Sequence, residues 1–96
     1  ENLVANAAEQ AAYTVNQLRE QLADQSVSVR GFGLMIGIEL PKACGELVDV
    51  ARDQHHMIIN VTAGNVVRLL PTLNITKAQA DQLIERLVVM IKNFLA

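Results

Sequence analysis

The chain has 96 residues, which is enough for one domain with one hydrophobic core. Its formal net charge of −2 gives no electrostatic reason to expect binding to nucleic acid or to an anionic membrane. No apolar run reaches the roughly 18 residues that a membrane-spanning helix needs, and the polar-flanked start does not resemble a secretory signal. The single cysteine, Cys44, permits no internal disulfide, so we expect a cytoplasmic protein in which this residue is buried.

The composition is unusually aliphatic for a domain of this size. Apolar residues make up 51% of the chain, yet only Tyr13, Phe32 and Phe94 are aromatic. Such a chain should keep apolar surface after its core is filled. We therefore expect part of that surface to contact another part of the protein or a partner.

Residues 2–24 have the spacing of an amphipathic helix. Apolar side chains recur at steps of three and four along one stripe, which consists of Val4, Ala7, Ala11, Val15, Leu18 and Leu22. Charged and amide side chains occupy most of the other positions. The pattern predicts that this stripe packs on a sheet.

The segment "SVSVRGFGLMIGIELP", residues 26–41, alternates as two short strands do. Val27 and Val29 alternate with polar residues, and residues 34–40 alternate with a period of two. Gly31 and Gly33 between the two runs predict a turn or bulge that joins antiparallel strands. The glycines do not match a dinucleotide-binding motif, because a strand follows them where that motif needs a helix N-terminus.

Residues 43–54 are predicted to form a second helix. Cys44, Leu47, Val48 and Ala51 share one face of it. The adjacent histidines at 55 and 56 do not favour a metal site, because helical metal pairs usually stand four residues apart and no thiol or acidic cluster accompanies them. We expect them to close the helix instead.

The last third of the chain contains two more strands and a third helix. "HHMIINV" leads into a strand, residues 62–65 form a loop of small residues, and Pro71 ends the following strand. Thr76 and Gln79 form a T-x-x-Q capping box at the start of the final helix. Its expected buried face consists of Ala80, Leu83, Leu87, Val88, Ile91 and Leu95. The element order predicts one α+β domain over residues 1–96, with a small, largely antiparallel sheet covered by helices on one side.

Arg68 is the one charge in the apolar run "GNVVRLLPTL", residues 64–73. Alternation along a strand places Val66 and Leu70 beside it and puts Val67 and Leu69 on the opposite face. Because arginine stays protonated in proteins, leaving it buried and unpaired is costly. Two interpretations stay open: an internal ion pair, with Glu39 as the obvious partner, or a site for a ligand's carboxylate.

Two segments carry a resemblance to a known family. "VRGFGLMIGIEL" (29–40) and "NVTAGNVVRLLPTLNIT" (60–76) resemble the C-terminal small domain of class III aminotransferases, and the similarity extends over essentially the whole chain. These are fold-type I enzymes that use pyridoxal 5′-phosphate, and the acetylornithine branch is the most similar. The resemblance implies that Arg68 binds the α-carboxylate of an amino-acid or keto-acid substrate and that Gly64 and Asn65 lie near that substrate.

The resemblance also implies that the chemistry lies elsewhere in the protein. In this family the large domain supplies the lysine and the other groups that hold pyridoxal phosphate, whereas Lys42, Lys77 and Lys92 of this chain are predicted to be surface lysines. The chain would then be an inactive fragment of a homodimeric enzyme. The implied reaction moves an amino group from N-acetylornithine, or a related ω-amine, to 2-oxoglutarate.

The family usually has glycine at the position of His56, so we expect the turn after the second helix to be built differently here. The alternative to an aminotransferase is a self-contained, non-enzymatic α+β module that binds an amino-acid effector or a protein partner.

Overall fold

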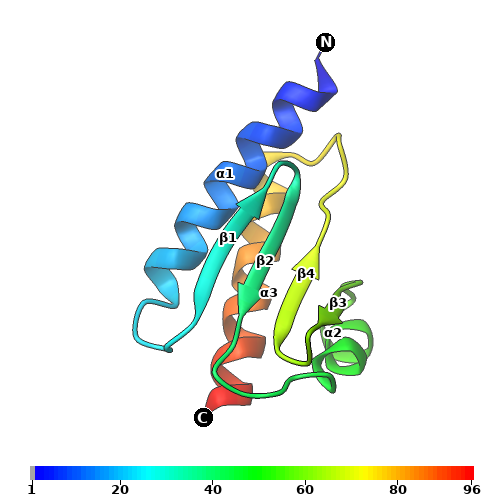
Figure 1. Cartoon of the computed structure of the whole chain (residues 1–96). Helices are drawn as coiled ribbons and strands as arrows, with labels where there is room; N and C mark the ends of the chain where they lie inside the picture. Colours follow the sequence, from blue (N-terminus) through cyan, green and yellow to red (C-terminus); the bar gives the residue numbers. More distant parts are fainter. Residues whose placement is uncertain (1) are drawn as a thin grey trace.

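The computed structural model describes residues 2–96 and shows helices on one face of an antiparallel sheet (Figure 1). Its elements are α1 (Leu3–Gln21), β1 (Ser28–Phe32), β2 (Met35–Glu39), α2 (Leu47–His55), β3 (Asn60–Thr62), β4 (Val66–Leu69) and α3 (Lys77–Leu95). The strands lie in the order β1-β2-β4-β3, and every neighbouring pair is antiparallel. The predicted element order and α+β class are confirmed. No helix within the described residues has the length and apolar character needed to cross a bilayer.

The core lies between the sheet and the helices α1 and α3. Ile36 and Ile38 of β2 and Val67 of β4 are fully buried on the sheet side. The helices contribute fully or almost fully buried side chains on the other side, namely Leu18, Leu22, Leu87, Met90 and Ile91. Burial of this continuous apolar layer is the main stabilising contribution that the fold offers.

Two details of the predicted helix faces are wrong. Val4 is 59% exposed, because the first turn of α1 projects beyond the end of the sheet (Figure 1). On α3, Leu83 and Leu95 are only partly buried, whereas Ile84 and Met90, which the predicted face did not include, are buried. The face of α3 is wider than the predicted stripe because it packs against α1, α2 and the sheet together.

The helix α2 begins at Leu47, so its predicted start at residue 43 is wrong by four residues. The backbone N–H of Cys44 donates to the carbonyl of Gly64, 2.8 Å away, and this bond holds the segment before α2 against the β3–β4 turn. Gly45 also weakens helix propensity there. The predicted burial of Cys44 is confirmed, and burial raises the pKa of its thiol, as does the nearby charge of Glu46.

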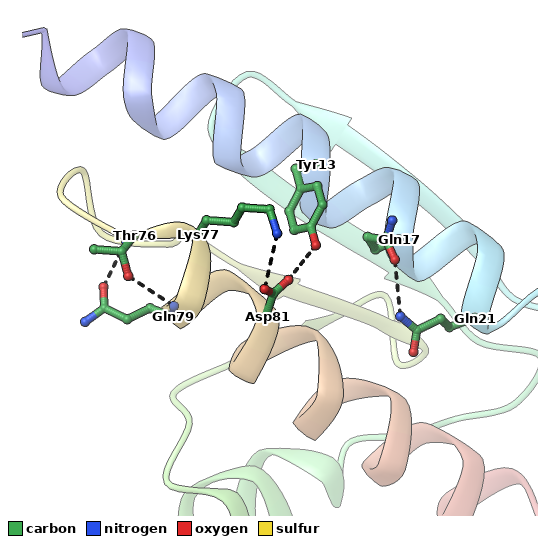
Figure 2. A network of polar contacts seen from close by, with 7 residues as sticks. All are labelled: Tyr13, Gln17, Gln21, Thr76, Lys77, Gln79 and Asp81. Carbon is green, nitrogen blue, oxygen red and sulfur yellow. Dashed lines mark hydrogen bonds and ion pairs between the residues drawn. The ribbon is translucent and has the colours of Figure 1, made fainter.

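The two helices of the main layer are tied together at one end by a polar network (Figure 2). The Tyr13 hydroxyl of α1 donates to Asp81 Oδ1 of α3 at 2.5 Å, and Lys77 Nζ lies 3.4 Å from Asp81 Oδ2. Next to it the predicted capping box is confirmed: Gln79 N donates to Thr76 Oγ1 at 3.1 Å, and Thr76 N donates to Gln79 Oε1 at 3.0 Å. These contacts fix the start of α3 beside α1.

This network predicts a pH dependence of stability. The hydrogen bond from Tyr13, followed by the charge of Lys77, lowers the pKa of the Asp81 carboxyl. A carboxyl with a lower pKa in the folded state stabilises the fold above its unfolded pKa of about 4 and loses that effect at lower pH. In urea denaturations at a series of acid pH values, the free energy of unfolding is expected to fall less steeply below about pH 4 for Asp81→Asn than for the parent chain. Tyr13→Phe should reduce the slope as well. A pH dependence of the free energy of unfolding identical to that of the parent chain would contradict a stabilising role for this network.

His56 ends α2 in a left-handed backbone conformation, with φ 54° and ψ 39°. The two histidines end α2, as predicted. The expectation that this turn is built differently is wrong, because His56 adopts the left-handed conformation that glycine normally takes there. Because a side chain in this region is strained by about 1 kcal/mol, His56→Gly is expected to stabilise the domain by up to about that amount. His55→Gly, one residue earlier and still helical, should destabilise it by about 0.5–1 kcal/mol. Urea denaturation of both variants distinguishes them, and the same sign for both would contradict the prediction.

Candidate functional site

The face of the sheet opposite the helices carries Arg68. Val67 and Leu69 of β4 lie on the face opposite Arg68, as alternation predicted, and are buried against the helices with exposed fractions of 0% and 7%. Arg68 is half-buried on the other face, which carries no helix. In the strand register it stands opposite Gly37 of β2 on one side and Asn60 of β3 on the other. We call this surface the open face.

The carboxylate that could have neutralised Arg68 internally is bound elsewhere. Glu39 Oε1 lies 2.8 Å from Arg30 Nη2, and this pair joins β1 to β2 on the open face. Both side chains are about half exposed, so the pair contributes at most about 1 kcal/mol. Within residues 2–96, Arg68 forms no ion pair and its side chain makes no hydrogen bond. The internal pair between Glu39 and Arg68 is therefore not formed.

A hollow of about 550 Å³ lies beside Arg68. Its lining consists of Met35, Ile58, Ile59, Asn60, Arg68, Leu69 and Leu70. Ile58 is 83% exposed and Leu70 is 62% exposed, so much of the wall is apolar surface that the chain leaves uncovered. The volume falls within the range of sites for small molecules. One permanent cation and one amide in an otherwise apolar wall suit a small carboxylic acid with an aliphatic chain.

The other two predicted site residues lie at the opposite end of β4, in the turn from β3. Asn65 donates from Nδ2 to the Leu40 carbonyl at 2.9 Å, and its own carbonyl accepts from the Leu40 N–H at 2.9 Å. Gly64 has φ +81°, which favours glycine. Both residues thus hold the turn against the segment that follows β2, and neither lines the hollow beside Arg68.

Several lining residues were not identified from the sequence. Asn60, Met35 and Ile58 reach the hollow only because β3 and β2 flank β4 in this register. Strand order and register depend on contacts that are distant in sequence, so no local pattern indicates them. Alternation along β4 was the one available signal, and it correctly placed Leu70 beside Arg68.

The lysines of the described residues do not fit a cofactor-binding role. A lysine that forms a Schiff base needs a pKa lowered by desolvation. The pKa of Lys77 is instead raised, by Tyr13 and then by Asp81. Lys42 lies 4.5 Å from the ring centroid of Phe94, remote from the hollow, and Lys92 is an exposed residue near the end of α3. Residues 2–96 also contain no cluster of three or more histidine, cysteine or acidic side chains that could hold a metal ion.

Comparison with solved structures defines the class of fold. Ornithine aminotransferase PY00104 from Plasmodium yoelii superposes with a TM-score of 0.80 and 28% identity, covering 95% of this chain and 25% of that one. Plasmodium falciparum ornithine delta-aminotransferase gives a TM-score of 0.75 and 35% identity, covering 93% and 24%. The predicted small-domain fold of fold-type I aminotransferases is thereby confirmed.

Comparison of sequences defines the family. The model described as aminotransferase class-III matches residues 1–91. Acetylornithine aminotransferase 1 of Bordetella parapertussis is 46% identical over 98 aligned positions, and acetylornithine aminotransferase of Methanosarcina mazei is 42% identical over 85. These alignments cover 100% and 88% of this chain. The chain belongs to the class III aminotransferase family.

The match covers only part of each relative. It accounts for 25% of the Bordetella parapertussis protein and 21% of the Methanosarcina mazei protein, so the chain spans about a quarter or less of the length of these relatives. Family membership favours the aminotransferase interpretation over a self-contained binding module.

Proposed function

We propose that this chain is the substrate-binding small domain of a pyridoxal-phosphate-dependent aminotransferase, and that Arg68 binds the carboxylate of its substrates. The observation that carries the proposal is the placement of Arg68 on the open face, beside a hollow of about 550 Å³ and without an ion pair among residues 2–96. A guanidinium can hold a carboxylate through two parallel hydrogen bonds. Glu39 does not compete for it, because Glu39 pairs with Arg30.

The proposed reaction of the full-length protein transfers an amino group from N-acetylornithine, or a related ω-amine, to 2-oxoglutarate. The names of the relatives from Bordetella parapertussis and Methanosarcina mazei support this choice of donor. Gly64 and Asn65 do not line the hollow beside Arg68, so in this proposal they act indirectly, by holding the turn before β4 against the segment that follows β2. The full-length protein would act in the cytoplasm as a homodimer.

Pyridoxal phosphate would supply the electron sink for the transfer, and the remainder of the protein would hold it. The surroundings of Lys42, Lys77 and Lys92 support this assignment of the cofactor site to the rest of the protein, because all three lysines are exposed. The contribution of this chain is positioning. Arg68 fixes one end of the substrate while the apolar wall beside it contacts the aliphatic chain, which reduces the orientations that the reacting end can sample.

The proposal is tested by comparing the 96-residue chain with the full-length protein, each supplied with pyridoxal phosphate, N-acetylornithine and 2-oxoglutarate. Glutamate formation is the measurement. The full-length protein is expected to form glutamate, and the 96-residue chain is expected to form none. Turnover by the 96-residue chain would overturn the proposed division of labour, and a full-length protein inactive with N-acetylornithine, ornithine and 4-aminobutyrate would overturn the proposed activity.

A further inference from the structure

We propose that Asn60 is a second substrate-binding residue, whose side-chain amide donates a hydrogen bond to the carboxylate held by Arg68. This inference rests on the proposed function of Arg68 and extends it. The proposed ligand is an aliphatic amino acid or oxo acid. Its carboxylate accepts two hydrogen bonds from the guanidinium of Arg68 and a third from the side-chain amide of Asn60.

The strand register brings the two side chains together. Asn60 and Arg68 are direct cross-strand partners in the antiparallel pair of β3 and β4, so both point to the open face. Directly opposed residues of such a pair have Cβ atoms about 4.5–5.5 Å apart. Both residues line the same hollow, and Asn60 is exposed there. Within residues 2–96 the Asn60 amide makes no hydrogen bond, so its two donors are available.

The direct neighbour of Arg68 on the other flank has no polar side chain, and the nearest polar side chains of β1 and β2 on this face, Arg30 and Glu39, are paired with each other. That direct neighbour is Gly37, and the ring of Phe32 lies over that glycine: a Cβ added at Gly37 would stand 3.1 Å from Phe32 Cε2. A carboxylate at Arg68 therefore meets an aromatic ring on the β2 side and an amide on the β3 side. The asymmetry places the bound acid between Arg68 and Asn60.

The chemistry of the donor set is consistent with one carboxylate. An ionised carboxylate has about four lone-pair sites, of which a guanidinium fork uses two. An amide can fill a third without carrying a charge that would repel the acid or neutralise the arginine. The rest of the hollow is formed largely by Met35, Ile58 and Leu70, which suit methylene groups and not a second charge.

The test uses the full-length protein with the variants Asn60→Ala and Asn60→Asp, and with Thr62→Ala as the matched control. Thr62 lies on the same strand and the same face but stands opposite Val66, outside the hollow. Losing a hydrogen bond to a charged group predicts a KM about tenfold higher for Asn60→Ala, with kcat nearly unchanged. Asn60→Asp should raise KM further, because its carboxylate would pair with Arg68. Thr62→Ala should leave KM unchanged.

A second measurement separates substrate binding from a structural role. Valerate and pentylamine share an aliphatic chain, but only valerate carries a carboxylate. Asn60→Ala is expected to weaken inhibition by valerate about tenfold and to leave inhibition by pentylamine unchanged. Equal weakening of both inhibitors, or of neither, would overturn the inference.

The two proposals fail in different ways. If Arg68→Lys raises KM while Asn60→Ala does not, the role of Asn60 is wrong and that of Arg68 stands. If neither variant changes KM, the carboxylate site itself is wrong. If both raise KM, the double variant should raise it by less than the product of the two single effects, because the residues bind the same group; full independence would overturn the shared site.

Discussion

Arg68→Lys in the full-length protein is expected to raise KM for both the amino donor and 2-oxoglutarate by about tenfold or more. Lysine keeps the charge but cannot reproduce the two parallel hydrogen bonds of the guanidinium. Losing one hydrogen bond to a charged group costs about 1.5–3 kcal/mol, which corresponds to roughly 10- to 100-fold in affinity. Steady-state kinetics with each substrate varied in turn provide the measurement.

Arg30→Lys is the matched control for this prediction. Arg30 lies on the same open face, but it pairs with Glu39 and does not line the hollow. Its replacement should leave both KM values close to those of the parent enzyme. An unchanged KM in Arg68→Lys would show that Arg68 has a structural role. An equal rise in both variants would point to a general structural disturbance of the open face, because both substitutions keep the positive charge.

Leu87→Ala is expected to lower the free energy of unfolding by about 2–5 kcal/mol. Leu87 lies on α3 with 0% of its side chain exposed, so its truncation leaves a cavity in the layer between helices and sheet. A domain of this size has a total stability of only about 5–10 kcal/mol, so the loss is a large fraction of it. Urea denaturation of the 96-residue chain is the measurement.

Val89→Ala, two residues further along α3, is the control for that loss. Val89 is 45% exposed and lies outside the buried core, so its truncation should cost less than about 1 kcal/mol. Similar losses for the two variants would contradict the packing of α3 described here.

The sequence predicted those features of the fold that depend on neighbours along the chain. The capping box of Thr76 and Gln79 marked the start of α3, and alternation placed Val67 and Leu69 on the face of the strand opposite Arg68. Both signals act within one turn or one strand. They are therefore independent of how the elements pack.

Features that depend on tertiary contacts could not be predicted in this way. The start of α2 depends on the bond between Cys44 and Gly64, 20 positions apart in the sequence. The pairing of Glu39 with Arg30, and not with Arg68, depends on the position of β1 at the edge of the sheet. The placement of Asn60 in the candidate site depends on the register of β3.

The one-sided cover of the sheet has a consequence for how this domain can diverge. The polar network of Tyr13 and Asp81 joins two helices (Figure 2), and the apolar core lies between the helices and the sheet. The strand register places Arg68 and Asn60 on the other face of the sheet, which carries no helix (Figure 1). Residues that maintain folding and residues that meet the ligand are thus two nearly separate sets. If the uncovered side binds substrate as proposed, substitutions there should change binding of the acid with little effect on the stability of the core.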